Sequence, residues 1–176
     1  MAHKVVMSGF GGQGIVLMGK LLAHAAMMDG KHSTFFPSYG AAMRGGTANC
    51  SVVVSDEEIA SPVVRRPDSV IAMNELSLKK FEKSINSGGT IFINSSLVKM
   101  LPSRKDISAV PVPANQIAEK LGDVRAANMA LLGAFLKKTQ AVALETVMNS
   151  LGSVISERRK GLIGMNCDAL KSGYSL

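Results

Sequence analysis

The stretch Lys4–Met28, KVVMSGFGGQGIVLMGKLLAHAAMM, decides the fold. Its opening KVVMS is apolar and rich in valine, which predicts a short buried strand. The glycine-rich turn GFGGQG follows over residues 9–14. From Ile15 onward the residues are apolar and favour a helix, which Asp29 and Gly30 end. A strand, a glycine turn and a buried helix together form the opening of an α/β unit.

The rest of the chain continues this alternation. Further strands are predicted over residues 32–36, 47–55, 68–73, 90–94 and 107–112, and helices over 74–85, 114–121, 125–139 and 143–156. Pro37 is expected to end the second strand. The pattern predicts an α/β fold, a three-layer α/β/α sandwich with a mostly parallel, Rossmann-like sheet. Because the strand over 47–55 follows a loop instead of a long helix, we expect part of the sheet to be antiparallel.

The length of 176 residues favours one domain. We assign residues 1–158 to a single α/β domain. Residues 159–176 are glycine-rich and weakly patterned, so we expect an extended C-terminal tail that packs on a neighbouring surface, such as a partner chain.

Composition narrows the class of protein. At 47% hydrophobic residues the chain is too apolar to be disordered. Its apolar runs are interrupted well before the length that a membrane span needs, and its first residues lead into a strand and not into a signal peptide. Cys50 and Cys167 lie far apart and belong to no CxxC pair, which argues against an iron–sulfur or zinc site in this chain. We therefore expect a cytoplasmic protein that binds no metal.

The net charge of +7 points to an acidic partner, such as phosphates, nucleic acid or an acidic protein surface. Local clusters occur at Arg65–Arg66 and at Arg158–Lys160, while the other basic residues are spread along the chain. A solvated basic surface is the simplest interpretation. With no Trp and few Tyr and Phe, the chain offers few platforms for stacking bases, so we do not expect nucleic-acid binding.

The first candidate site is the glycine turn. Gly9, Gly11 and Gly14 satisfy GxGxxG between a strand and a helix, where the backbone N–H groups and the helix N-terminus attract an anion. A dinucleotide site also needs an acidic residue about 20 positions on, at the end of the second strand. None stands near Phe36. A different phosphate, a carboxylate, or a tight turn without a ligand all remain open.

The second candidate site is the loop SYGAAMRGG over residues 38–46. Its small residues allow close approach, Tyr39 offers a ring, and Arg44 is the one cation in either loop, suited to a bidentate contact with an anion. The alternative is a glycine-rich turn with a solvated arginine. We expect both loops to lie together at the carboxyl ends of adjacent strands. The candidate cofactor-binding residues are Gly9, Gly11, Gly12, Gln13, Gly14, Ser38, Tyr39, Gly40, Arg44, Gly45 and Gly46.

Catalytic residues are not apparent in the sequence. His3, His24 and His32 lack the spacing of metal ligands, and no Ser/His/acid set or pair of carboxylates appears in a suitable setting. Asn128, among small and apolar residues, should find a hydrogen-bond partner if it is buried, and a bond at the helix start is the simpler role. These features predict a domain that completes the active site of another chain.

The motifs now point to a family. The string GFGGQG, the loop Ser38–Gly46, Ser61-Pro62 with Pro67-Asp68, and the later segments around 112–118 and 128–133 resemble the gamma subunit of the 2-oxoacid:ferredoxin oxidoreductases, which act on pyruvate, 2-oxoisovalerate or 2-oxoglutarate. The resemblance covers roughly residues 3 to 155. The matching domain of the indolepyruvate enzymes is similar, so that variant stays open.

The resemblance implies an accessory subunit of an oxidoreductase that acts on the oxo group of its donor, with an iron–sulfur protein as acceptor. The complete enzyme would use thiamin diphosphate, iron–sulfur clusters and CoA, held mainly by other subunits, to convert a 2-oxoacid to an acyl-CoA. The implied partners are alpha, beta and delta subunits, and ferredoxin through the complex, with no nucleic acid and no membrane. We expect the isolated chain to be inactive and to form a homodimer. Rival hypotheses are a stand-alone Rossmann-type nucleotide-binding protein and a basic nucleic-acid-binding module.

Overall fold

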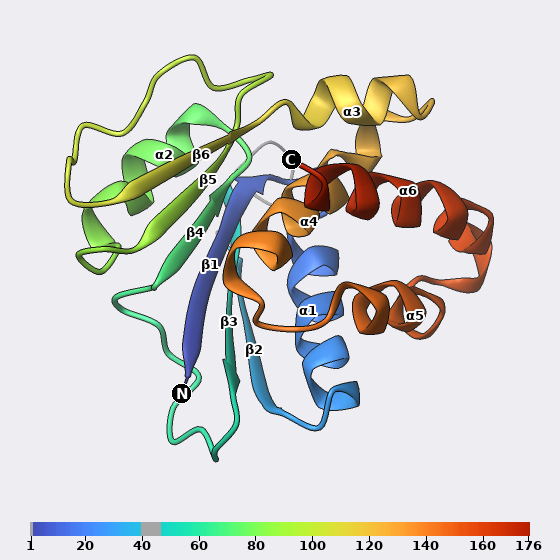
Figure 1. The fold of residues 1–176 in the computed structure, drawn as a ribbon, viewed down its shortest axis with the longest axis horizontal. Coiled ribbons are helices and arrows are strands. Elements are labelled where there is room, and N and C mark those ends of the chain that lie inside the picture. The colour runs from blue at the N-terminus through green and yellow to red at the C-terminus, as the bar shows by residue number, and fades with distance from the viewer. Residues whose placement is uncertain (1, 40–46) are drawn as a thin grey trace.

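Six strands form one mixed sheet within residues 2–39 and 47–176, the part of the chain that the computed structural model describes (Figure 1). The sheet order is β2-β3-β1-β4-β5-β6. Neighbours β1, β4, β5 and β6 are parallel, whereas β3 is antiparallel to both β1 and β2. The predicted α/β fold with a partly antiparallel sheet is confirmed. The strands are β1 His3–Phe10, β2 His32–Tyr39, β3 Thr47–Ser55, β4 Ser69–Ala72, β5 Thr90–Asn94 and β6 Ser108–Val112.

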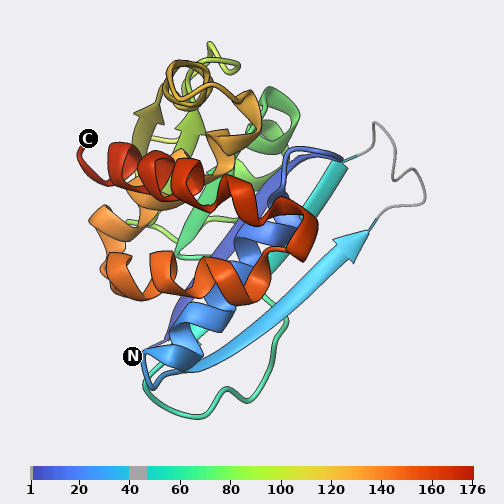
Figure 2. The same ribbon diagram turned by 90° about the vertical axis from the view of Figure 1, so that its right-hand side faces the viewer.

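Helices cover both faces of this sheet, but unequally. Helices α1 and α4 pack on one face, α5 and α6 pack outside them, and α2 covers the other face (Figures 1 and 2). The α-helices are α1 Ile15–Met28, α2 Glu75–Phe81, α3 Ala114–Lys120, α4 Ala127–Thr139, α5 Leu144–Val154 and α6 Ile163–Tyr174. Short 3-10 turns are η1 Glu82–Ser84, η2 Val124–Ala126 and η3 Glu157–Leu162.

Strand β1 shows why the opening stretch is so apolar. Val5 and Met7 belong to the hydrophobic cluster beneath α1 and α4, whereas Val6 belongs to the cluster beneath α2. A strand buried on both faces needs apolar residues in succession. In the larger cluster Phe92 of β5 meets Phe135 of α4 edge to face, with ring centroids 5.7 Å apart.

The expected end of the second strand at Pro37 is wrong, because β2 continues to Tyr39. Pro37 lies opposite Cys50 of β3, and β2 is the outermost strand of the sheet. A proline lacks an N–H, which breaks a ladder only where a neighbouring strand would accept that bond. An edge strand can turn the proline nitrogen away from its single neighbour, so the strand continues.

The extended conformation expected for the C-terminal tail is also wrong. Residues 163–174 form α6, whose Ala169 and Leu170 are fully buried in the larger cluster. Its Gly173 lies so close to α4 that a Cβ there would overlap the carbonyl oxygen of Ala130. The glycine that weakened the helical pattern is therefore what lets the two helices approach. That this segment also contacts a partner chain stays a prediction.

Candidate functional site

The carboxyl ends of the parallel strands form one edge of the sheet, called here the carboxyl edge. The glycine turn follows β1 at this edge. Gly12 and Gly14 have φ of 97° and 73°, in the left-handed region that favours glycine. A Cβ on Gly9 would lie 2.6 Å from Gln13 Oε1 and 2.9 Å from Met73 Cβ. The turn therefore needs glycine for its backbone angles and for its close packing against the end of β4.

Gln13 ties the turn to the neighbouring helix. Its Oε1 accepts a hydrogen bond from the Phe10 N–H at 2.7 Å and from Asn74 Nδ2 at 3.4 Å. Asn74 Oδ1 in turn accepts from the Ser77 N–H at 2.9 Å and so caps α2. Beneath them, Ser8 Oγ lies 2.9 Å from Ser77 Oγ. Side chains from β1, from the turn itself and from the start of α2 thus fix the conformation of the turn.

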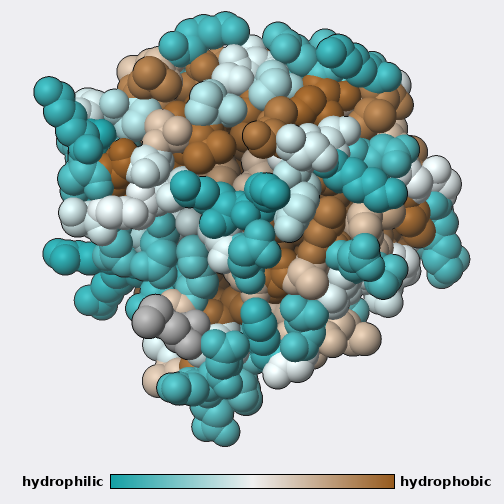
Figure 3. Space-filling model, in the orientation of Figure 1, coloured by the Kyte–Doolittle hydropathy of each residue, from teal (hydrophilic) through white to brown (hydrophobic). Residues whose placement is uncertain are grey.

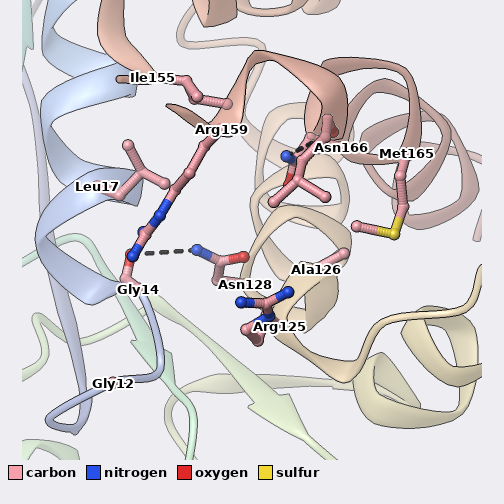
Figure 4. Close-up of a pocket in the computed structure, with 11 residues that line it drawn as sticks. Gly12, Gly14, Leu17, Arg125, Ala126, Asn128, Ile155, Arg159, Met165 and Asn166 are labelled. Atoms are coloured by element: carbon pink, nitrogen blue, oxygen red, sulfur yellow. Dashed lines mark hydrogen bonds between the residues drawn. The ribbon is translucent and has the colours of Figure 1, made fainter. Parts of the chain in front are cut away.

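A small pocket of about 120 Å³ lies between the start of α1, the start of α4 and the η3–α6 segment (Figure 4). It brings the glycine turn together with residues from the C-terminal third of the chain. The pocket is lined by Gly12, Gly14, Leu17, Arg125, Ala126, Asn128, Ile155, Arg159, Leu162, Met165 and Asn166.

Asn128 forms the inner wall of this pocket and is 2% exposed. Its Nδ2 donates to the Gly14 carbonyl at 3.1 Å, so the partner expected from the sequence is present. Its Oδ1 has no hydrogen-bond partner among the described residues and, in Figure 4, points away from Gly14. A buried acceptor without a donor costs free energy, which a hydrogen bond from a ligand would offset.

The charge around the pocket is positive. Gly14 precedes α1 without a side-chain cap, and the first turn of α1 carries no acidic residue, so its N–H groups favour an anion. The Arg125 guanidinium is engaged by Asp123, with Nε 2.8 Å from Oδ2, and lowers the pKa of that carboxyl. Arg159 lines the same pocket, and its side chain has no hydrogen bond or ion pair within the described part of the chain. The cation of Arg159 is thus available to a ligand.

The structure places only part of the second candidate loop. Ser38 and Tyr39 end β2 at the carboxyl edge, paired with Asn49 and Ala48 of β3. The expectation that this loop follows a strand adjacent to β1 is wrong, because β3 lies between β1 and β2. Both strands nevertheless end at the same edge, since each is antiparallel to β3. Gly40, Arg44, Gly45 and Gly46 lie outside the described residues.

Sequence reasoning missed three polar residues of the pocket, namely Arg125, Arg159 and Asn166. They come from segments more than a hundred positions after the glycine turn. The basic run Arg158–Lys160 was the one sequence feature that could have indicated an anion site in this part of the chain. The run does not show that Arg159 lines the pocket while Arg158 does not.

Residues 2–39 and 47–176 contain no group of three or more His, Cys, Asp or Glu side chains that could hold a metal ion. Within the same residues, none of the helices has both the length and the apolar character needed to cross a membrane.

A sequence profile described as pyruvate ferredoxin/flavodoxin oxidoreductase matches residues 4–176. The chain belongs to this oxidoreductase family. The resemblance seen in the glycine and arginine motifs is thereby confirmed.

Relatives within the family share the gamma-type domain. The chain is 32% identical to the 2-oxoglutarate synthase subunit KorC of Methanocaldococcus jannaschii over 180 residues, covering 100% of this chain and 94% of KorC. It also matches the crystal structure of a keto/oxoacid ferredoxin oxidoreductase gamma subunit from Geobacter sulfurreducens with a TM-score of 0.86 and 28% identity, covering 99% and 95% of the two chains. The chain is thus a gamma-type subunit of this family.

A third relative is a longer protein. The ketoisovalerate oxidoreductase subunit VorA of Methanothermobacter thermautotrophicus is 42% identical over 133 residues, which cover 76% of this chain but only 28% of VorA. The larger part of VorA therefore lies outside the match. The same domain occurs within a longer chain in VorA and makes up nearly the whole of KorC.

Proposed function

We propose that this chain is the gamma subunit of a thiamin-diphosphate-dependent 2-oxoacid:ferredoxin oxidoreductase and helps to complete its active site. The enzyme would decarboxylate a 2-oxoacid oxidatively to an acyl-CoA and reduce ferredoxin in the cytoplasm. Family membership and the near full-length match to gamma-type subunits support this proposal. Alpha, beta and delta subunits would hold the thiamin cofactor and the iron–sulfur clusters.

The comparison of VorA with KorC supports the proposed partners. In VorA the domain is covalently joined to further sequence, whereas in KorC it makes up nearly the whole chain. Such a pair of relatives supports a functional contact between the domain and the additional sequence. We infer that the free-standing form meets an equivalent chain through a non-covalent interface.

The pocket beside the glycine turn would bind one anionic group at the subunit boundary. Its volume of about 120 Å³ is well below the roughly 300–1,000 Å³ of sites that enclose a drug-sized ligand. It fits a carboxylate or a phosphate, from the 2-oxoacid, a cofactor or CoA, and not a whole cofactor. The observation that carries this proposal is the buried, unpartnered Asn128 Oδ1 in a pocket that also holds Arg159 and the start of α1.

In this proposal the chain contributes binding and orientation. The α1 N–H groups and Arg159 would hold the anion, and Asn128 Oδ1 would accept a hydrogen bond from an N–H or O–H of the same ligand. Gln13 and Asn74 would keep the turn in shape, since they fix its backbone to α2.

The test replaces Arg159 in the assembled enzyme. Losing a charge-assisted hydrogen bond costs about 1.5–3 kcal/mol. Arg159→Ala should therefore lower kcat/KM for either the 2-oxoacid or CoA by roughly tenfold to a hundredfold. Arg159→Lys should recover part of the loss. Arg158→Ala is the matched control, because the adjacent Arg158 does not line the pocket.

Kinetics of Arg159→Ala that equal those of Arg158→Ala, in fully assembled enzyme, would remove the pocket from the active site. The isolated wild-type chain should not oxidise a 2-oxoacid with a dye acceptor. Turnover by the single chain would contradict an accessory role.

A further inference from the structure

Five large apolar side chains remain exposed at the carboxyl edge and along the segment that leads away from it after β5. They belong to residues that end or follow three strands lying side by side in the sheet, β1, β4 and β5. Because these strands are parallel, all three end at the same edge. We call this set the apolar edge, and its members are Phe10, Leu76, Leu97, Met100 and Leu101.

The segment after β5 is held in place although it exposes apolar side chains. The N–H groups of Leu97 and Val98 donate to the Asn94 carbonyl, at 3.0 and 2.9 Å, and Val98 is buried beneath α2. Further along, Ser103 Oγ donates to Glu82 Oε1 at 2.8 Å, and the Arg104 N–H donates to the same oxygen at 2.8 Å. The exposure of Leu101, at 68%, is thus a property of an anchored segment. Figure 3 shows hydrophobic surface among hydrophilic side chains where this segment and α2 lie in Figure 1.

The segment that carries most of the apolar edge is rich in basic residues. Residues 74–106 carry six Lys and Arg against three Asp and Glu. Two of these cations are paired, Lys79 with Glu75 and Arg104 with Asp106. Lys99 follows β5 beside the apolar edge, and its Nζ donates to the Ser95 carbonyl. Lys83 and Lys105 also have no ion pair within the described residues, but they lie near the starts of β4 and β5, at the opposite edge of the sheet. An apolar surface with an exposed lysine beside it fits a protein surface with apolar residues and an acidic group at its border.

We propose that the apolar edge is the docking surface for the partner chain equivalent to the part of VorA outside the match. This inference rests on the proposed function and adds the location of the interface. Exposed apolar surface of this kind typically marks an interaction site, and Phe10 directly precedes the glycine turn whose Gly12 and Gly14 line the pocket. A partner seated on Phe10 and the β5 segment would cover the glycine turn as well, which would place the anion at the boundary between two chains.

The test measures binding of the purified chain to the enzyme that lacks this subunit. Leu101→Glu should weaken binding at least about tenfold, because it places a charge on the most exposed apolar side chain of the proposed interface. Met28→Glu is the matched control. Met28 is 67% exposed, as Leu101 is 68% exposed, but it ends α1 at the opposite edge of the sheet. Thermal unfolding of each variant checks that both remain folded.

Several outcomes would overturn the proposal. Binding of Leu101→Glu within about twofold of wild type would do so, as would an equal loss in Met28→Glu. If Leu101→Glu instead abolishes a homodimer and leaves partner binding unchanged, a second copy covers this surface and the proposal fails. If the wild-type chain does not bind the other subunits, the proposed function fails with it. If Leu101→Glu fails to assemble while Arg159→Ala keeps normal kinetics, the docking surface is supported, and only the proposed anion-binding role of the pocket is contradicted.

Discussion

Two regions of this molecule depend on glycine, for different reasons. The turn over residues 9–14 needs glycine because Gly12 and Gly14 adopt left-handed backbone angles. The contact between α4 and α6 needs glycine because Gly133 and Gly173 lie against the backbone of the opposing helix, with no room for a Cβ. At the turn, the left-handed backbone angles place the start of α1 and its N–H groups beside a pocket. In the helix pair, the absence of a Cβ lets α4 and α6 pack backbone against backbone.

The comparison shows that glycine content alone does not separate a binding loop from a packing contact. The turn glycines follow a fixed spacing between a strand and a helix, which marks their role in the sequence. The helix glycines are 40 positions apart, and their role depends on a contact between distant segments. Substitutions can therefore test the two regions separately.

The largest effect is expected in the helix pair. A Cβ on Gly173 would overlap the Ala130 carbonyl oxygen, so Gly173→Ala must push α6 away from α4. We expect a loss of about 2–4 kcal/mol in the free energy of unfolding. The midpoint of thermal unfolding should fall by roughly 5–15 °C.

The control for this change is Gly164→Ala in the same helix. A Cβ on Gly164 meets nothing within 4 Å, and alanine favours a helix over glycine by up to about 1 kcal/mol. Gly164→Ala should therefore leave stability unchanged or raise it. Equal stabilities of the two variants would show that α6 can shift without cost, and the distinction between the two regions would fail.

A smaller loss is expected at the turn. Gly14→Ala imposes a φ of 73° on alanine, which costs about 1–2 kcal/mol, and it also displaces the amide of Asn128. Gly30→Ala is the control, because Gly30 has a φ of 74° but open space around its Cβ. Urea unfolding should show Gly14→Ala to be the more destabilised by about 1 kcal/mol, the scale of one hydrogen bond.

A double-mutant cycle sharpens this prediction. In an Asn128→Ala background the extra cost of Gly14→Ala over Gly30→Ala should disappear, since the displaced amide is gone. If the extra cost persists, the contact with Asn128 is not its cause.

The smallest effect is expected in the chemical reactivity of the two cysteines, which differs without any change in the stability of the fold. Cys50 reports on the region beneath α1, and Cys167 reports on α6. Cys50 lies beneath α1, where its Sγ donates to the Ile15 carbonyl at 3.4 Å and burial raises its pKa to about 12. Cys167 lies in α6 and is partly exposed, with a smaller rise in pKa that also comes from burial. Because the thiolate is the reactive form, a thiol reagent at pH 8 should label Cys167 at least about tenfold faster than Cys50.

Gly173→Ala should accelerate labelling of Cys167 more than labelling of Cys50, because it loosens α6 first. Mass spectrometry of peptides containing each cysteine measures both rates. Similar labelling rates for both cysteines in the wild-type protein would show that the region beneath α1 opens as readily as α6.

The local elements were largely predictable from the sequence. Apolar runs such as those over 68–73 and 90–94, and the glycine turn before Ile15, predicted strands and helices that the structure contains. These signals are local, because each depends on residues within one strand or one helical turn. The family resemblance was likewise carried by short motifs, and the profile match confirms it.

The pocket and the sheet order were not predictable in this way. Arg159 reaches the glycine turn only because α5 and α6 pack on α1 and α4. The position of β3 between β1 and β2 depends on long-range pairing that no residue pattern within β3 specifies. The helix at the C-terminal end of the sequence was not predicted, because a glycine such as Gly173 lowers the local helix propensity. The close contact with α4 that this glycine allows cannot be seen from the neighbouring residues alone.

The position of α6 after α4 in the sequence has a consequence for biosynthesis. Because synthesis runs from the N-terminus, α4 emerges from the ribosome before the helix that covers it. Until then the α4 surface around Ala130 and Gly133 has no cover, although α4 is buried nearly all round in the finished protein. A nascent chain stopped before Ile163 would therefore display this surface to chaperones and proteases.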